Sequence, residues 1–116
     1  MLKIYHNNRC RKSREALQYL QDNDYDFEII EYLKTPLKAS EWKEVLALID
    51  KKPSEVVRTQ ETLWKQEFKG KDLTESEILN QLAENPRLIE RPIVIDGKSG
   101  TLGRPLENLI TFLKEN

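Results

Sequence analysis

The sequence contains very few of the residues that most often build disulfides and metal sites. Its 116 residues include one cysteine, one histidine and one methionine. A single cysteine excludes an internal disulfide, and one cysteine with one histidine excludes a transition-metal site made from these ligands. The net charge is only -1, so no overall basic excess favours nucleic acid or an anionic membrane as a partner. Any electropositive site must therefore be local.

Long hydrophobic runs are also missing. No apolar stretch approaches a membrane span, which needs roughly 18 residues. The N-terminal residues MLKIYH lack the basic start and apolar core of a secretory signal. We therefore expect a soluble protein of the reducing cytoplasm. The length predicts a single domain, residues 1–116, around one core.

The hydrophobic pattern of the first third predicts a strand, a helix and a second strand. Residues 2–6 alternate like a short strand, residues 13–20 have helical spacing, and residues 27–33 have the composition of another strand. A connection of this length through a helix joins two parallel strands in a right-handed βαβ unit.

The middle of the chain is predicted to be a helical insertion, about residues 40–85. Ser40 is expected to cap a helix that Pro53 ends. Thr74 and Glu77 have the spacing of a capping box for a later helix. This insertion separates the two halves of the predicted sheet.

The last third predicts two strands and a helix. Residues 91–95 form a strand, Asp96-Gly97 is a hairpin signal before a short return strand, and Pro105 opens a terminal helix. The order β-α-β, helical insertion, β-β-α resembles the thioredoxin-like fold. The expected fold class is therefore α/β, with a small mixed sheet.

The single thiol lies in the stretch IYHNNRCRKSREAL, residues 4–17, where the first strand is expected to lead into the first helix. A free cysteine often packs as a small buried hydrophobe. The neighbours of Cys10 are instead polar or basic: Asn7, Asn8, Arg9, Arg11 and Lys12. A helix start and nearby cations both stabilise a thiolate and lower the thiol pKa. The pattern predicts that Cys10 is an activated nucleophile.

Three arginines lie at predicted element boundaries: Arg58, Arg91 and Arg104. Each alone could be a solvated surface charge, but these boundaries can meet at the Cys10 end of the sheet. There, planar guanidinium groups would bind a tetrahedral oxyanion in a bidentate manner. In a thioredoxin-like fold Pro92 is expected to be cis and to lie against the thiol; the alternative is an ordinary trans proline at an edge strand.

Three segments resemble the glutathione/glutaredoxin-coupled arsenate reductase family. IYHNNRCRKSREAL is similar to its active-site segment, RPIVID to its arginine and cis-proline strand, and LGRP to its late arginine motif. The similarity runs from Leu2 to about Leu113. The resemblance implies the following roles: Cys10 as nucleophile, Arg58, Arg91 and Arg104 as oxyanion ligands, His6 beside the thiol favouring its ionised form, and Asn7, Ser13 and Pro92 in support. His6 could instead be a satisfied strand histidine with no role.

The resemblance also implies the partners. Arsenate is the expected substrate, glutathione the cosubstrate and glutaredoxin the protein partner, with no bound metal or organic cofactor. Asn8 occupies a position where the family usually has proline, and Arg9, Arg11 and Lys12 make the loop more basic than usual. These differences leave the substrate preference open.

Two alternative functions remain. The chain could be a thiol oxidoreductase acting on another glutathione-linked substrate, or a non-enzymatic regulator of the same superfamily that binds RNA polymerase. Such regulators resemble this chain but switch through C-x-x-C, whereas the fourth position here is Ser13. The oligomeric state does not follow from the sequence.

Overall fold

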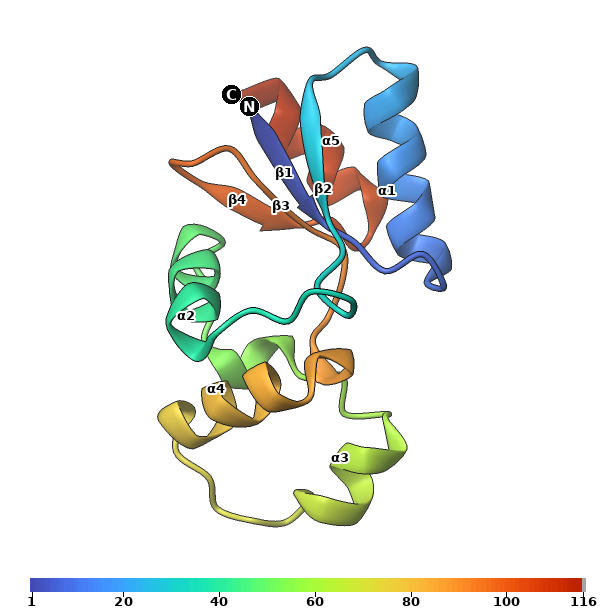
Figure 1. Ribbon diagram of the computed structural model, residues 1–116. Coiled ribbons are helices and arrows are strands. Elements are labelled where there is room, and N and C mark those ends of the chain that lie inside the picture. Colours follow the sequence, from blue (N-terminus) through green and yellow to red (C-terminus); the bar gives the residue numbers. More distant parts are fainter. Residues whose placement is uncertain (116) are drawn as a thin grey trace.

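A computed structural model describes residues 1–115. Its element order confirms the predicted α/β arrangement, with helices inserted between a β-α-β half and a β-β-α half (Figure 1). The elements are β1 (Leu2–Tyr5), α1 (Arg11–Asp22), β2 (Phe27–Ile30), α2 (Ala39–Leu48), η1 (Pro53–Val56), α3 (Thr62–Glu67), α4 (Glu75–Glu84), η2 (Pro86–Leu88), β3 (Ile93–Ile95), β4 (Gly100–Leu102) and α5 (Leu106–Glu115). None of the helices within residues 1–115 combines the length and apolar character needed to cross a membrane.

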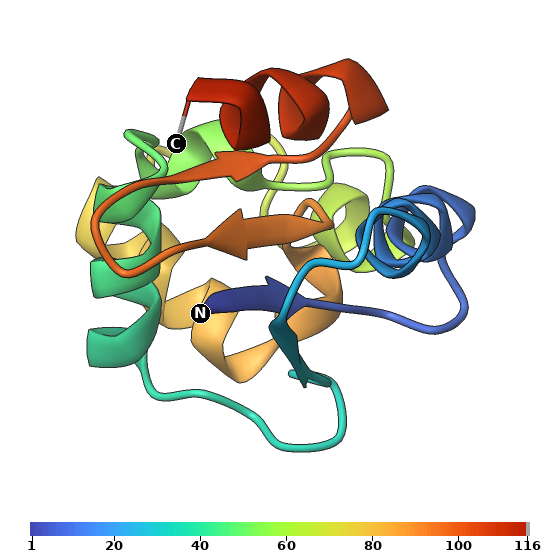
Figure 2. The ribbon, with the colours of Figure 1, turned by 90° about the horizontal axis from the view of Figure 1, so that it is seen from above.

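The four strands form one mixed sheet in the order β2-β1-β3-β4, which Figure 2 shows from above. β1 and β2 are parallel, with Leu2 opposite Phe27, as the βαβ prediction requires. β3 is antiparallel to both β1 and β4. The chain therefore leaves β1 and β2, and enters β3, at the same edge of the sheet.

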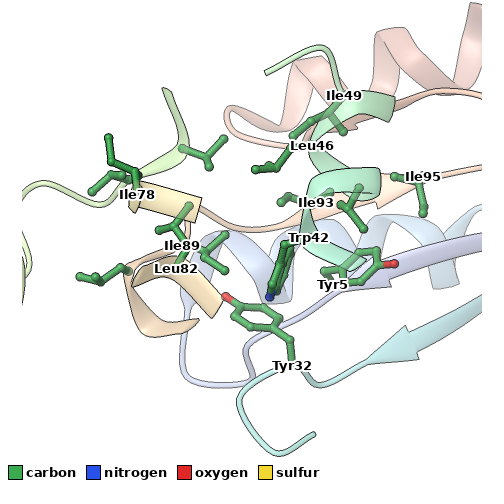
Figure 3. Close-up of a cluster of buried hydrophobic side chains, with 14 residues drawn as sticks. Tyr5, Tyr32, Trp42, Leu46, Ile49, Ile78, Leu82, Ile89, Ile93 and Ile95 are labelled. Atoms are coloured by element: carbon green, nitrogen blue, oxygen red, sulfur yellow. The ribbon is translucent and has the colours of Figure 1, made fainter. Parts of the chain in front are cut away.

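Helices cover both faces of the sheet. Ile4 and Val94 point to the face that α1 and α5 cover, where they pack with Ala16, Leu20 and Leu109. The alternate strand residues point to the other face, where α2 and α4 complete a second cluster (Figure 3) that includes Tyr5, Ile93, Ile95, Trp42, Leu46 and Leu82. All three residues of β3 are buried because successive side chains of a strand point to opposite, covered faces.

The capping predictions for the insertion are half right. Thr74 and Glu77 form the predicted capping box, in which the Glu77 N–H donates to the Thr74 hydroxyl over 3.1 Å. The prediction for Ser40 is wrong, because the cap position is two residues earlier, at Lys38, and α2 begins at Ala39. The Lys38 N–H donates to the Glu41 carboxylate over 3.1 Å, which places the helix start ahead of the serine.

Two predicted element ends are also wrong. Pro53 does not end α2: the helix stops at Leu48, Asp50 adopts a left-handed conformation with a φ of 56°, and Pro53 starts the short η1 helix. The second strand ends at Ile30 instead of residue 33. It ends early because the Glu31 carbonyl accepts hydrogen bonds from the next turn, so the backbone leaves the sheet.

The start of β4 requires a glycine. A Cβ on Gly100 would lie 2.6 Å from the Ile95 Cγ2 atom and 2.7 Å from the Val94 carbonyl oxygen. Because the Val94 backbone belongs to the sheet and cannot move aside, we expect Gly100→Ala to lower the free energy of unfolding by about 1–3 kcal/mol. Urea denaturation measures this change. Gly103→Ala is the control, since the nearest atom to its new Cβ would be in the Pro92 side chain, at 3.3 Å; equal losses in both variants would contradict the prediction.

Candidate active site

Cys10 lies where the sequence predicted, at the position preceding the first turn of α1. Its backbone is extended, with φ −95° and ψ 120°, and its N–H donates to the Asn7 carbonyl over 3.0 Å. The side chain is half-buried. The residue therefore faces the free N–H groups of the helix start while the sulfur stays accessible.

Arg91 supplies a buried positive charge next to this cysteine. Arg91 is 8% exposed to solvent. Its Nη1 donates to the Arg87 carbonyl over 3.2 Å, and its Nε is buried with no hydrogen-bond partner in the described chain. Within residues 1–115 it forms no ion pair with a carboxylate. A buried cation without a counterion favours the binding of an anion.

The Cys10 thiol has a lowered pKa, as the sequence predicted. Burial is the largest single influence and opposes ionisation. The Ser13 backbone N–H, the Arg91 guanidinium and the Lys12 backbone N–H together outweigh it, so the pKa falls below the ordinary value. The helix start and one buried arginine therefore activate the sulfur.

Hydrogen bonds within the β1–α1 loop fix the approach to Cys10. His6 and Ser13 are buried. The His6 Nε2–H donates to the Asn8 Oδ1 over 2.8 Å, and the Ser13 hydroxyl donates to the His6 Nδ1 over 2.6 Å. The Asn7 backbone N–H donates to the Ser13 oxygen over 3.0 Å. His6, Asn7 and Ser13 thus build the loop, and the predicted effect of His6 on the thiol stays a prediction.

The other two predicted arginines approach the segment that carries Arg91. Arg58 pairs with Glu61, and the Arg104 Nη1 lies 3.7 Å from a Glu90 carboxylate oxygen. Both also donate to backbone carbonyls of residues 87–91, Arg58 over 3.5 Å and Arg104 over 3.3 Å. The structure thus brings all three arginines to one segment. Their role in binding an oxyanion stays a prediction.

Pro92 lies between Arg91 and the first residue of β3. The Arg91–Pro92 peptide bond is cis, as the sequence predicted. The Arg104–Pro105 bond is also cis, which the sequence analysis did not foresee. The Pro92 carbonyl accepts the Gly103 N–H over 2.8 Å, which ties the start of β3 to the chain that follows β4.

Sequence reasoning missed Tyr32, because the predicted strand ran through it. The residue is 1% exposed and follows the end of β2. Burial raises the pKa of its hydroxyl to about 12, although the charge of Arg91 and its side-chain hydrogen bond act in the opposite direction. The signal that could have found it is topological, since residues that follow parallel strands meet at one edge of the sheet.

A cavity of about 270 Å³ lies beside the active-site loop. One wall consists of loop residues 6–9, and the other of Glu31, Leu33 and Lys34. Cys10 is not among the residues that line this cavity. Arg9 and Lys34 bring positive charge to its walls and Glu31 brings negative charge.

Similarity to known proteins agrees with this geometry. The model of the ArsC family matches residues 5–112. The chain belongs to the ArsC family. It is 36% identical over 114 residues to an arsenate reductase of Neisseria meningitidis, covering 97% of both chains. It is 34% identical to an arsenate reductase of Haemophilus influenzae, covering 95% of this chain and 97% of that one.

The fold is likewise that of the ArsC family. The structure matches the arsenate reductase from Vibrio cholerae with a TM-score of 0.89 and 33% sequence identity, over 95% of each chain. The predicted thioredoxin-like fold is therefore confirmed. Among residues 1–115, no group of three or more histidine, cysteine, aspartate or glutamate side chains is placed to hold a metal ion.

The electrostatics of this site predict a pH-dependent reactivity of Cys10. We expect iodoacetamide alkylation to show a midpoint below that of free cysteine, because the helix start and Arg91 favour the thiolate. Arg91→Gln should move this midpoint to higher pH. Arg11→Gln removes the same charge from an exposed side chain paired with Glu15 and should have little effect. A wild-type midpoint at or above that of free cysteine would refute the activated thiol.

Proposed function

We propose that this protein is an arsenate reductase that uses glutathione as cosubstrate and glutaredoxin as reducing partner. The observation that carries the proposal is the buried Arg91 guanidinium, which forms no ion pair with a carboxylate of residues 1–115, beside a Cys10 thiol of lowered pKa. A cation and a nucleophile at one point suit an anionic electrophile. Membership in the ArsC family, whose relatives include arsenate reductases, supports arsenate as that electrophile.

The first step would join the substrate to the protein. The Cys10 thiolate attacks arsenic, an S–As bond forms and one As–O bond breaks. The departing hydroxide takes up a proton and leaves as water. Arsenic remains As(V), because the step exchanges one ligand for another and transfers no electrons to arsenic. Arg91 and the first N–H groups of α1 would balance the negative charge that collects on the arsenate oxygens.

Arg58 and Arg104 are proposed to bind the remaining oxygens. Their carboxylate partners do not prevent this, because both ion pairs are partly exposed to solvent. Pairs of this kind contribute only about 0–1 kcal/mol. A dianion that accepts two parallel hydrogen bonds from one guanidinium is a stronger partner. Arginine also retains its charge at every physiological pH.

The second step would reduce arsenic. The glutathione thiolate attacks the Cys10 sulfur of the adduct, an S–S bond forms, and the electron pair of the S–As bond stays on arsenic. Arsenic is thereby reduced from As(V) to As(III) and leaves as arsenite, while Cys10 and glutathione become a mixed disulfide. A glutaredoxin thiol then attacks the glutathione sulfur and restores the Cys10 thiol.

An external thiol is needed because the chain supplies no second one. Cys10 is the only cysteine, and Ser13 occupies the position where a resolving thiol would lie. The Ser13 hydroxyl is already engaged by His6. A serine at this position, in place of a second cysteine, also disfavours the alternative of a dithiol-switched regulator of RNA polymerase. We assign the small zwitterionic thiol to the cavity beside the loop, whose walls include Arg9 and the Glu31–Lys34 ion pair.

The proposal predicts arsenate-dependent turnover. With glutathione, glutaredoxin, glutathione reductase and NADPH present, we expect arsenate to start NADPH oxidation and Cys10→Ser to abolish it. Omission of glutaredoxin should reduce the steady rate strongly, because the mixed disulfide then accumulates. The proposal would be contradicted if arsenate started no NADPH oxidation. Turnover of another glutathione-linked substrate in the same assay would then favour the alternative oxidoreductase function.

The proposal also predicts the trapped intermediate. Arsenate and glutathione without glutaredoxin should leave the protein carrying one glutathione after a single turnover, since no internal thiol can displace it. Intact-mass analysis under non-reducing conditions measures this adduct, and glutathione without arsenate is the control. A disulfide-linked dimer through Cys10, or steady arsenite formation with no added thiol, would contradict the glutathione-resolved mechanism.

A further inference from the structure

The cavity beside the active-site loop lies next to Cys10 but apart from the three arginines proposed to bind the oxyanion. Its walls come from the segments that follow the parallel strands β1 and β2, which end at the same edge of the sheet (Figure 1). Arg9 lines the cavity and directly precedes Cys10, and the carbonyl of Asn7, another lining residue, accepts the Cys10 N–H over 3.0 Å. None of the three proposed oxyanion ligands lines it. The cavity is therefore a second site beside the nucleophile.

A largely buried amide is one of the polar groups of this cavity. Asn7 is 8% exposed and lines the cavity. Its Oδ1 accepts the Arg9 N–H over 3.0 Å, whereas its Nδ2 group makes no hydrogen bond within residues 1–115. This Nδ2 is not among the enclosed unpaired atoms of the described chain, so it is open to solvent. The amide can therefore donate to an acceptor in the cavity, such as a peptide carbonyl.

The charged side chains that line the cavity are two cations and one anion. Arg9 forms no ion pair with a carboxylate of residues 1–115. The Lys34 Nζ lies 3.3 Å from the Glu31 Oε1 in a solvent-exposed pair. Pairs of this kind contribute only about 0–1 kcal/mol, so a ligand can replace this one. A ligand with two carboxylates and one ammonium group carries the complementary set of charges, and a guanidinium binds a carboxylate through two parallel hydrogen bonds.

The proposed reaction needs a ligand of this kind beside Cys10. The chain has no second cysteine, so an external thiol must attack the Cys10 sulfur. Glutathione carries two carboxylates, one ammonium group and two peptide carbonyls, and its γ-glutamyl methylenes can contact Leu33, which lines the cavity and is 39% exposed. An extended peptide spans about 3.3–3.6 Å per residue, so a tripeptide bound at Arg9 reaches the sulfur of the next residue. Displacement at sulfur also proceeds from the side opposite the breaking bond, which suits a thiol site separate from the oxyanion site.

We propose that four side chains of this cavity form the binding site of the resolving thiol. Arg9 and Lys34 bind the two carboxylates of a peptide thiol, the Asn7 amide donates to a peptide carbonyl, and Glu31 accepts the ammonium group. The ligand class is a small zwitterionic peptide thiol, and its assignment to glutathione rests on the proposed function. The covalent step is unchanged: the thiolate attacks the Cys10 sulfur, an S–S bond forms, and the electron pair of the S–As bond stays on arsenic.

S-methylglutathione tests this site, because it keeps the charges and carbonyls of glutathione but cannot form a disulfide. Titrated into the wild-type protein, it should shift the backbone amide resonances of residues 6–9 and 31–34. Arg9→Gln should raise its Kd about 10-fold, since one carboxylate loses a charged hydrogen-bond partner. Arg11→Gln is the matched control: it removes the same charge from the other neighbour of Cys10, outside the cavity, and should leave the Kd unchanged. No binding, shifts confined to other residues, or equal weakening in both variants would overturn the proposal.

A change in the ligand gives a second test of the same contacts. The ethyl ester of the glycyl carboxylate of S-methylglutathione should bind the wild type about 10-fold more weakly, because one charge-assisted contact is lost. This cost should disappear in one of the two variants Arg9→Gln and Lys34→Gln, namely the one that lacks the partner of that carboxylate. A cost that persists in both variants would contradict the proposed contacts.

The binding measurements contain no arsenate, so the site and the proposed function fail separately. In the glutaredoxin-coupled assay, Arg9→Gln should raise the KM for glutathione about 10-fold and leave the KM for arsenate unchanged. Binding of S-methylglutathione in the cavity without arsenate turnover would refute the reductase function and leave the thiol site standing. Arsenate turnover sustained by a protein thiol, with no binding of S-methylglutathione, would refute the thiol site and leave arsenate reduction standing.

Discussion

A buried guanidinium that forms no ion pair with a carboxylate of residues 1–115 is the constraint on which the candidate site depends. Arg91 is held by one backbone carbonyl and lies beside the thiol of Cys10, whose pKa it helps to lower. Desolvating such a cation is costly unless an anion accompanies it. The thiolate partly meets this need, which couples the ionisation of the nucleophile to the burial of the arginine. The helix start adds further positive potential at the same point.

The sequence specified the main features of this arrangement because they depend on local chemistry. The hydrophobic periods predicted the strand and helix order, including a helix start near Cys10, and the polar neighbours of Cys10 argued against a core position. The prediction of a cis bond at Pro92 followed from the expected fold and is confirmed. Element ends were less predictable. The Ser40 cap was wrong because a glutamate three residues beyond Lys38 sets the start of α2.

The remaining details depend on contacts between distant segments, which periodicity does not reveal. The strand pattern passed through Tyr32, whereas the backbone leaves β2 at Ile30 and carries the tyrosine to the active-site edge. The interaction of His6 with Asn8 requires the fold of the loop, because both residues could equally have pointed to solvent. The partners of Arg58 likewise follow from the packing of the insertion against residues 87–91.

If the proposed function holds, the charge balance gives a reason for three arginines at the site, of which only Arg91 has no carboxylate partner within residues 1–115. At rest, the negative thiolate is matched by Arg91, and two further cations would leave the site strongly positive. Arg58 and Arg104 are instead neutralised by glutamates in partly exposed ion pairs. In the proposed reaction, arsenate brings about two negative charges at neutral pH. If Arg58 and Arg104 released their glutamate partners and bound arsenate oxygens instead, they would supply two matching positive charges. The glutamates would therefore neutralise these arginines only until the substrate binds.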